Sequence, residues 1–355
     1  MQVNIANKLW SRKGQFASAL VLGVGLTVAG TLGASAQSVT LRVADSFSEK
    51  HYVSTQLITP WIARVEELTD GDVAFEYYPA EALAKSKDLL DAGKNRIADI
   101  VYVAPLYVSD RLPLSSVVAM PGVAGNATQK SAAYQKLVDD LLAEAEFAPE
   151  GMVPLIAVTV AGYEFNLSGP RIEDTQSIAG KKMRSSGGLQ EKTVEALGGT
   201  AVQIAGPEVY AALQRGTVDG SITPLASVQP YAFDEVLESI TTNADLGTFP
   251  ITYAINADVW DTLSDDAKAA MRTASLEVNA SFGNFVDART VTAEEELREK
   301  GLDLYELPED ILADFRAKSA PIADEWAKNL DDRGFPASRV LEAWKTLLNG
   351  EDSAS

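Results

Sequence analysis

The chain has 355 residues and no cysteine, which excludes disulfides, thiol catalysis and cysteine-ligated metal sites. Its 50 Asp and Glu residues outnumber 30 Lys and Arg, giving a net charge of −20. A surface this acidic repels nucleic acid and anionic lipid, so we expect no nucleic-acid partner. Any site for an anion has to be local and well built. The length suits one large domain or two medium ones.

The N-terminus has the pattern of a secretory signal peptide at residues 1–36. It has a basic start at Lys8, Arg12 and Lys13, an uncharged apolar run at 16–32 and a small-residue cleavage site at Ala34-Ser35-Ala36. We expect cleavage after Ala36; the alternative is an uncleaved anchor helix, because the run approaches bilayer-spanning length. Cleavage would leave 27 Lys and Arg against 50 Asp and Glu, a net charge of −23. No later segment has the length and apolarity of a membrane span.

Strand and helix patterns alternate through the first part of the chain, which predicts an α/β fold with a mostly parallel sheet covered by helices. The expected strands are 39–44, 73–77, 100–103 and 154–161, and the expected helices are 54–68, 85–92 and 131–145. The strand at 154–161 is expected to cross between two lobes.

A second α/β unit follows and ends in a return strand at 251–256. Its expected strands are 182–184, 201–203 and 219–222, and its expected helices are 189–197 and 208–214. The pattern from Ser264 to Lys300 is helical, with Ser264 as the N-cap; it predicts one spine helix, or two helices with a break near Gly283. Amphipathic helices are expected at 311–329 and 337–348.

Arg184 ends a short apolar strand pattern, and a Ser-Ser-Gly-Gly turn and a helix beginning at Leu189 follow it. A guanidinium can hold a carboxylate through two parallel N–H bonds, and the free N–H groups of a first helical turn add donors. Glycines in the turn would let a ligand approach the backbone. The alternative interpretation is that Arg184 forms an ion pair with a carboxylate on the protein surface. The pattern favours a protein that holds a small organic acid without transforming it.

Aromatic and polar residues near the strand ends are candidates for a small-molecule pocket. Phe47, Tyr52, Tyr102 and Tyr107 can line it with apolar rings and polar tips, and Ser221 and Thr223 can face a cleft at the carboxyl end of their strand. His51 is the only histidine, and without a second histidine or a cysteine we expect it on the surface or in a loop; its place in the first strand–helix loop keeps a ligand contact possible. Nucleophile-elbow, phosphate-loop, zinc-protease and dinucleotide-binding motifs are missing. We therefore expect no enzyme and no cofactor.

A longer signature resembles the TRAP transporter solute-binding proteins, the family described as C4-dicarboxylate-binding. The matching residues are Gly180–Arg184, Ala196–Gly199, Glu208–Gln214, Gly216, Val218–Gly220 and Pro224-Leu225. The resemblance covers nearly all of the mature chain. It implies a periplasmic protein that delivers its ligand to the subunits of a sodium-driven membrane permease, and that Arg184 pairs with the ligand carboxylate.

The resemblance also implies two α/β lobes, joined by crossing strands and a long helix, with the ligand clamped between them. The expected division is a first lobe at 37–160, to which later segments return, a second lobe at 161–256, and a long helix with further helices at 257–355 that pack on both lobes. The family as a rule needs no metal; a cation that bridges the carboxylates of the ligand and the protein is the alternative that the sequence leaves open. A monomer is expected.

Two departures from the family pattern bear on the ligand. Glu164, within Gly162–Asn166, falls near the place where many acid-binding members carry a second arginine, and Thr223 replaces the usual asparagine. Both changes favour a monocarboxylate over a dicarboxylate or sialic acid. If Glu164 faces the cleft beside Tyr163, it could pair with an ammonium group, so a small amine or zwitterion is an alternative ligand.

Two other classes of protein remain open from sequence. A secreted hydrolase that uses carboxylates needs no nucleophile motif, although it would normally need an aromatic sugar cleft. A ligand-sensing or chaperone-like module that meets a receptor instead of a permease would have the same binding residues.

Overall fold

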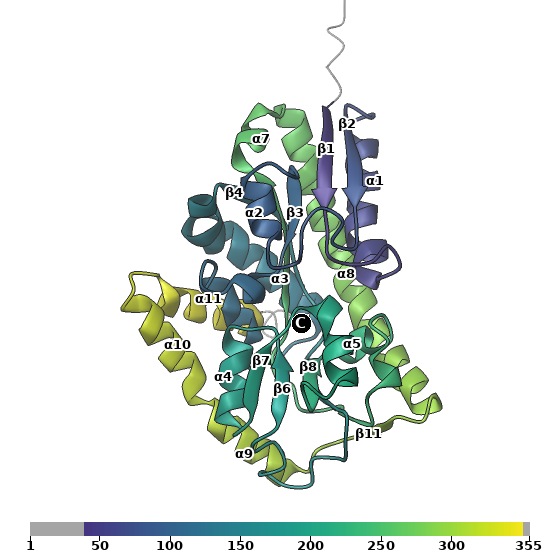
Figure 1. The fold of residues 1–355 in the computed structure, drawn as a ribbon. Coiled ribbons are helices and arrows are strands. Elements are labelled where there is room, and N and C mark those ends of the chain that lie inside the picture. Colours follow the sequence, from purple (N-terminus) through teal and green to yellow (C-terminus); the bar gives the residue numbers. More distant parts are fainter. Residues whose placement is uncertain (1–38, 351–355) are drawn as a thin grey trace, which may run out of the picture. The chain divides into compact units, whose positions relative to one another are not determined.

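The computed structural model describes residues 39–350, which form two α/β lobes around two separate sheets (Figure 1). The predicted signal peptide lies outside the described residues. Within 39–350, no helix combines the length and the apolarity needed to cross a membrane.

The first lobe is built on a five-stranded sheet with the order β2-β1-β3-β10-β4. Strands β1 and β2 are parallel, as are β1 and β3, whereas β10 runs antiparallel to both β3 and β4. Its strands are β1 (Val39–Ala44), β2 (Val73–Tyr78), β3 (Ile100–Val103), β4 (Met152–Thr159) and β10 (Pro250–Asn256). Its helices and turns are η1 (Ser54–Ile58), α1 (Thr59–Leu68), α2 (Leu89–Lys94), η2 (Pro105–Val108), η3 (Leu114–Ala119), α3 (Ala127–Leu137), η4 (Val138–Phe147), η5 (Ala148–Glu150) and α7 (Ala257–Thr262).

The second lobe is built on a six-stranded sheet with the order β11-β9-β5-β8-β6-β7. Strand β6 is parallel to β7 and β8, and β5 is antiparallel to β8 and β9. Its strands are β5 (Glu164–Leu167), β6 (Lys182–Ser185), β7 (Thr200–Gln203), β8 (Gly220–Thr223), β9 (Ser239–Thr241) and β11 (Asp303–Tyr305). Its helices are α4 (Leu189–Ala196), α5 (Gly206–Gln214), α6 (Leu225–Val228) and the short turn η6 (Phe233–Glu235).

Two chain segments and one long helix connect the lobes. Residues 160–163 lead from β4 into β5, and residues 242–249 return from β9 to β10. Helix α8 (Asp265–Glu299) packs on α1, α3 and β4 of the first lobe and on α6 and β11 of the second. Helices α9 (Glu309–Ser319) and α10 (Pro321–Asp331) pack on α4, whereas α11 (Ala337–Asn349) packs on α3.

Helix α8 is continuous over 35 residues, so the alternative of a break near Gly283 is wrong. The Ser264 hydroxyl accepts a hydrogen bond from the Ala267 N–H and caps the helix, as the sequence predicts. Gly283 has a packing role instead, because a Cβ there would lie 2.6 Å from the Thr128 Cα. The glycine therefore lets α8 and α3 approach closely.

Other differences from the sequence-based prediction concern short elements and one boundary. The helix expected at 85–92 forms later, at Leu89–Lys94, and the three strands β5, β9 and β11 were not predicted. Strand β10 belongs to the first sheet, so the expected boundary of the second lobe at residue 256 is wrong; its continuous segment ends before Pro250, and β11 at Asp303–Tyr305 returns to it. These strands have three or four residues or depend on partners far away in the chain, and a local pattern does not report such pairings.

Candidate ligand-binding site

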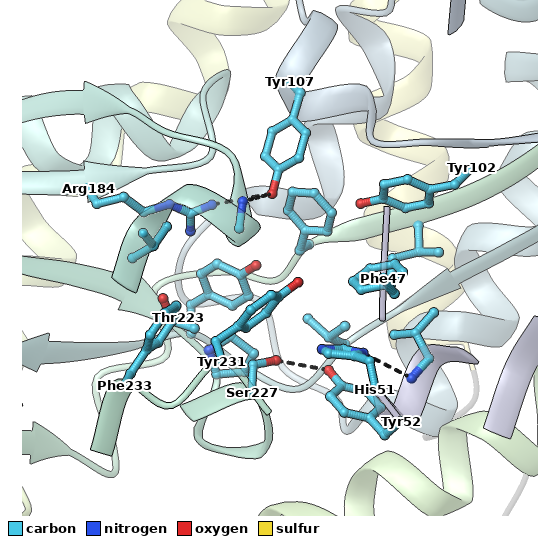
Figure 2. A pocket seen from close by; sticks show the side chains of 18 residues that line it. Phe47, His51, Tyr52, Tyr102, Tyr107, Arg184, Thr223, Ser227, Tyr231 and Phe233 are labelled. Carbon is cyan, nitrogen blue, oxygen red and sulfur yellow. Dashed lines mark hydrogen bonds between the residues drawn. The ribbon is translucent and has the colours of Figure 1, made fainter. Parts of the chain in front are cut away.

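A pocket lies where the carboxyl ends of β1, β3, β6 and β8 meet the two crossing segments, the usual place for a ligand in open α/β sheets (Figure 2). The first lobe contributes Phe47, His51, Tyr52, Val53, Tyr102 and Tyr107. The strands and segments that connect the lobes contribute Val160, Tyr163, Phe249 and Ile251. The second lobe contributes Arg184, Gly206, Val209, Thr223, Pro224, Ser227, Tyr231 and Phe233. These side chains leave only a small cavity between them, of about 40 Å³.

Arg184 is the one residue with a permanently charged side chain among those that line the pocket, and it is only 3% exposed. Its Nε donates to the Ile204 carbonyl at 2.8 Å, and its terminal nitrogens donate to the Ile222 carbonyl at 3.3 Å and the Tyr107 hydroxyl at 3.4 Å. Within residues 39–350, no carboxylate forms an ion pair with Arg184. These three bonds leave one N–H on each terminal nitrogen for another acceptor.

Two tyrosine hydroxyls connect the lobes at the rim of the pocket. The Tyr107 hydroxyl accepts a hydrogen bond from the Gly206 N–H at 2.9 Å, at the start of α5. The Tyr52 hydroxyl lies 3.0 Å from the Ser227 hydroxyl on α6. Because each bond joins a residue of the first lobe to one of the second, the structure is a closed arrangement of the lobes.

Aromatic rings form most of the pocket wall, and they pack against one another. On the side opposite Arg184, the ring of Phe47 stacks on His51 with centroids 4.5 Å apart and meets Tyr102 edge-on at 4.9 Å (Figure 2). The ring centroid of Tyr231 lies 5.0 Å from that of His51. The packed rings give this side of the pocket an apolar, aromatic wall.

Burial sets the protonation states of the titratable groups around the pocket. It lowers the pKa of His51 to about 3, so the imidazole is neutral at physiological pH. Burial raises the pKa of Tyr52 to about 12, and it raises the pKa values of Tyr102 and Tyr231 well above the ordinary value for tyrosine. The hydroxyls therefore keep their protons, and the pocket carries a single positive charge from Arg184.

Eight of the nine binding residues expected from sequence line this pocket: Arg184, Thr223, Tyr102, Tyr107, Phe47, His51, Tyr52 and Tyr163. His51 lies in the loop after β1, as one of the two expected positions has it, but it is only 2% exposed, so the expectation of a surface position is wrong. Thr223 lines the pocket, whereas Ser221, two residues earlier on β8, does not and instead bonds the Thr223 hydroxyl.

Glu164 is the exception, because it does not line the pocket. Its carboxylate accepts hydrogen bonds from the Thr241 hydroxyl at 2.6 Å and from the Ala244 N–H at 2.9 Å. Burial raises the pKa of Glu164 to about 7. The side chain ties β5 to the segment that follows β9, and it is not available to an ammonium group in the pocket.

The glycine turn after Arg184 also differs from its predicted role. None of residues 185–189 lines the pocket, so the start of α4 does not form the expected anion site. Gly187 has a φ of +102°, and a Cβ there would lie 2.4 Å from the Leu106 carbonyl oxygen. The turn thus lets the second lobe pack closely on the first, and the helix start that does reach the pocket is that of α5, at Gly206.

Sequence reasoning missed the residues that reach the pocket from the second half of the chain: Ser227, Tyr231, Phe233, Phe249 and Ile251, with Gly206, Val209 and Pro224. Tyr231 and Phe233 stack on each other with centroids 5.3 Å apart. The sequence does show this aromatic pair between two predicted elements. It could not be assigned to the site, because the sequence does not report which loops of the two lobes come together.

Comparison with known proteins agrees with this architecture. The family model of bacterial extracellular solute-binding protein family 7 (DctP) matches residues 43–329. A solute-binding protein of Sulfitobacter sp. (strain NAS-14.1) is 28% identical over 312 residues, which cover 81% of this chain and 92% of that protein.

Two solved structures share the fold. One is a marine-metagenome TRAP solute-binding protein, specific for aromatic acid ligands and in complex with 3-hydroxybenzoate; it is 24% identical, with a TM-score of 0.82, over 88% of this chain and 99% of that one. The other is a TRAP solute-binding protein from Rhodoferax ferrireducens in complex with copurified benzoate, with the same identity and TM-score over 89% of this chain and 99% of that one. The chain thus belongs to bacterial extracellular solute-binding protein family 7, the family of TRAP transporter solute-binding proteins that its sequence signature resembles.

Proposed function

We propose that this protein captures a small aromatic monocarboxylate in the periplasm and delivers it to the subunits of a TRAP membrane permease. The observation that carries the ligand class is Arg184, a buried guanidinium without a carboxylate partner in the described part of the chain, set in a pocket walled by aromatic rings. A buried charge is costly unless it is paired, and a ligand carboxylate supplies the missing partner.

The charge of the pocket argues for one carboxylate instead of two. Arg184 is the only Lys, Arg, Asp or Glu among the residues that line it, and His51 is neutral. A dicarboxylate would leave its second charge in an apolar environment without a partner. An ammonium group would meet Arg184 as a like charge, and Glu164 does not reach it.

The walls of the pocket argue for a ring. Nine of its eighteen lining residues are aromatic, and the free space is small. The two similar solved structures support the same ligand class, since one holds 3-hydroxybenzoate and the other benzoate. Closure of the lobes through Tyr107 and Tyr52 would exclude water and strengthen the contact between Arg184 and the carboxylate.

Isothermal titration of the mature protein, from Gln37 onward, tests this proposal. Benzoate is compared with cyclohexanecarboxylate, succinate and benzylamine, which change the ring, the number of charges and the sign of the charge. We expect benzoate to bind most tightly. Arg184→Gln should weaken benzoate binding by about 2–5 kcal/mol, because the carboxylate is then buried without a cation.

Arg215→Gln is the matched control, since Arg215 is exposed and does not line the pocket. It should leave benzoate affinity unchanged. Equal benzoate affinity in wild type and Arg184→Gln, or tighter binding of succinate or benzylamine than of benzoate, would contradict the proposed ligand class. Uptake of labelled benzoate by cells with and without the gene, in the presence of the permease, tests the transport role.

A further inference from the structure

His51 is held in one tautomer by its own backbone. It lies in the loop after β1, and its Nδ1 accepts a hydrogen bond from the Val53 N–H at 3.1 Å. A nitrogen that accepts a hydrogen bond has no proton, and the imidazole is neutral because burial lowers its pKa to about 3. The single ring proton is therefore on Nε2, which makes this atom a donor and not an acceptor.

The Nε2–H of His51 has no hydrogen-bond partner within residues 39–350, although the atom is buried. The faces of the ring are covered by Phe47 and Tyr52, each with its centroid 4.5 Å away. Tilting the ring would break both stacks, and a half-turn within its plane would keep the stacks but lose the bond from Val53. In Figure 2 the second ring nitrogen points away from that bond, toward the interior of the pocket. A fixed, buried donor without an acceptor is costly, and a ligand acceptor would remove the cost.

His51 and Arg184 lie on opposite sides of the pocket (Figure 2). A ligand whose carboxylate is held by Arg184 presents the far part of its ring to His51. The hydroxyls of Tyr102 and Tyr231 also belong to residues that line the pocket, but a hydroxyl can turn to donate or to accept, so they do not discriminate between ligands with a donor and ligands with an acceptor. The His51 side chain cannot switch in this way, because its only polar atom without a partner is Nε2–H, which can donate a hydrogen bond but cannot accept one.

We propose that His51 is a specificity-determining residue that selects, among aromatic carboxylates, those with a hydrogen-bond acceptor on the part of the ring remote from the carboxylate, such as a hydroxyl oxygen. The inference rests on the proposed function, since Arg184 must hold the carboxylate for the far part of the ring to meet His51. Benzoate itself would bind with the Nε2–H left unpaired.

The test compares ligands that differ in one group of equal size. Dissociation constants of 3- and 4-hydroxybenzoate are measured by titration calorimetry against those of 3- and 4-methylbenzoate, for the wild type and for His51→Phe. Phenylalanine keeps the stacked ring and removes the donor. We expect the preference for hydroxyl over methyl, at the better ring position, to be about tenfold larger in the wild type than in His51→Phe. The cost of desolvating the hydroxyl cancels, because the same ligands meet both proteins.

His51→Gln is a rescue variant, because the amide nitrogen of glutamine can take the place of Nε2. It should restore part of the hydroxyl preference. An equal preference in wild type and His51→Phe would overturn the inference. Binding of both ligand types by the wild type, dependent on Arg184 but without a hydroxyl preference, would overturn it and leave the proposed function standing. If the wild type binds no aromatic carboxylate, the proposed function fails and the inference fails with it.

A measurement on the wild type alone keeps the inference testable if the variants do not fold. The chain has one histidine, so the proton on its Nε2 gives a single imidazole N–H signal in an untagged protein. Hydroxybenzoate should move this signal downfield by forming a hydrogen bond, and methylbenzoate should not. The same shift with both ligands would contradict a bond from His51 to the ligand.

Discussion

Replacing Tyr107 by phenylalanine tests whether lobe closure depends on a single hydroxyl. The Tyr107 hydroxyl, in η2 of the first lobe, accepts from the Gly206 N–H at 2.9 Å and from a terminal nitrogen of Arg184 at 3.4 Å, both in the second lobe. Phenylalanine keeps the ring contact with Phe249, whose centroid is 5.3 Å away. The substitution therefore removes two bonds between the lobes and little packing.

The size of the effect follows from these two bonds. Without the hydroxyl, the buried Gly206 N–H loses its acceptor in the closed form, which costs about 1–3 kcal/mol, whereas in an open form water would hydrate it. The contact with Arg184 is at the long end of hydrogen-bond distances and adds little. We expect ligand binding to weaken by about 1–2 kcal/mol, or about 5- to 30-fold in the dissociation constant.

Titration calorimetry with benzoate measures this change, and Tyr134→Phe is the matched control. Tyr134 also has a buried hydroxyl, which bonds Thr252 at 3.0 Å, but both residues belong to the first lobe and neither lines the pocket. The control should lower the unfolding temperature and leave affinity unchanged. Equal affinities for wild type and Tyr107→Phe, or equal losses in the two variants, would refute the assignment of a closing role to Tyr107.

Three further predictions concern packing, pH and protonation. Gly283→Ala should lower the free energy of unfolding by about 1–3 kcal/mol, because its Cβ would lie 2.6 Å from the Thr128 Cα; urea denaturation measures this change. At a helix position with open space, alanine would instead stabilise the protein, so a more stable variant would show that α8 and α3 are not so close. Burial raises the pKa of Glu164 to about 7 in the folded protein, so between about pH 4.5 and pH 7 the folded protein keeps a proton on Glu164 that the unfolded chain has released. The contribution of this residue to the free energy of unfolding should therefore fall by about 3 kcal/mol as the pH rises through this range. Glu164→Gln should remove that part of the pH dependence without changing benzoate affinity; unfolding curves with the same pH dependence as wild type would contradict the raised pKa. The ring protons of His51 should show no titration between pH 8 and pH 5 in NMR spectra, since its pKa is lowered to about 3, and a transition near pH 6.5 would show that the ring is hydrated.

Several features of this protein were determined by the sequence alone. The periodicity of the first strands and helices reports burial along a short stretch of chain, and β1, β3 and most of α8 formed where that pattern predicts. The strand-end pattern and the family signature both singled out Arg184, and this residue is the one cation among those that line the pocket. Tyrosines after predicted strands were also informative, since the carboxyl ends of strands converge on the pocket.

Only the tertiary structure decided what each of these residues faces. Glu164 and Tyr163 are neighbours in the chain, yet Tyr163 lines the pocket and Glu164 turns to Thr241 and Ala244. The pairing of β5 with β8 and β9, which positions Glu164, joins segments more than fifty residues apart, and no local pattern reports it. The same holds for His51, whose burial depends on rings from both lobes. Side-chain alternation and helical spacing record which residues are apolar, whereas the partner that satisfies or leaves unsatisfied a buried polar atom is a property of the assembled fold.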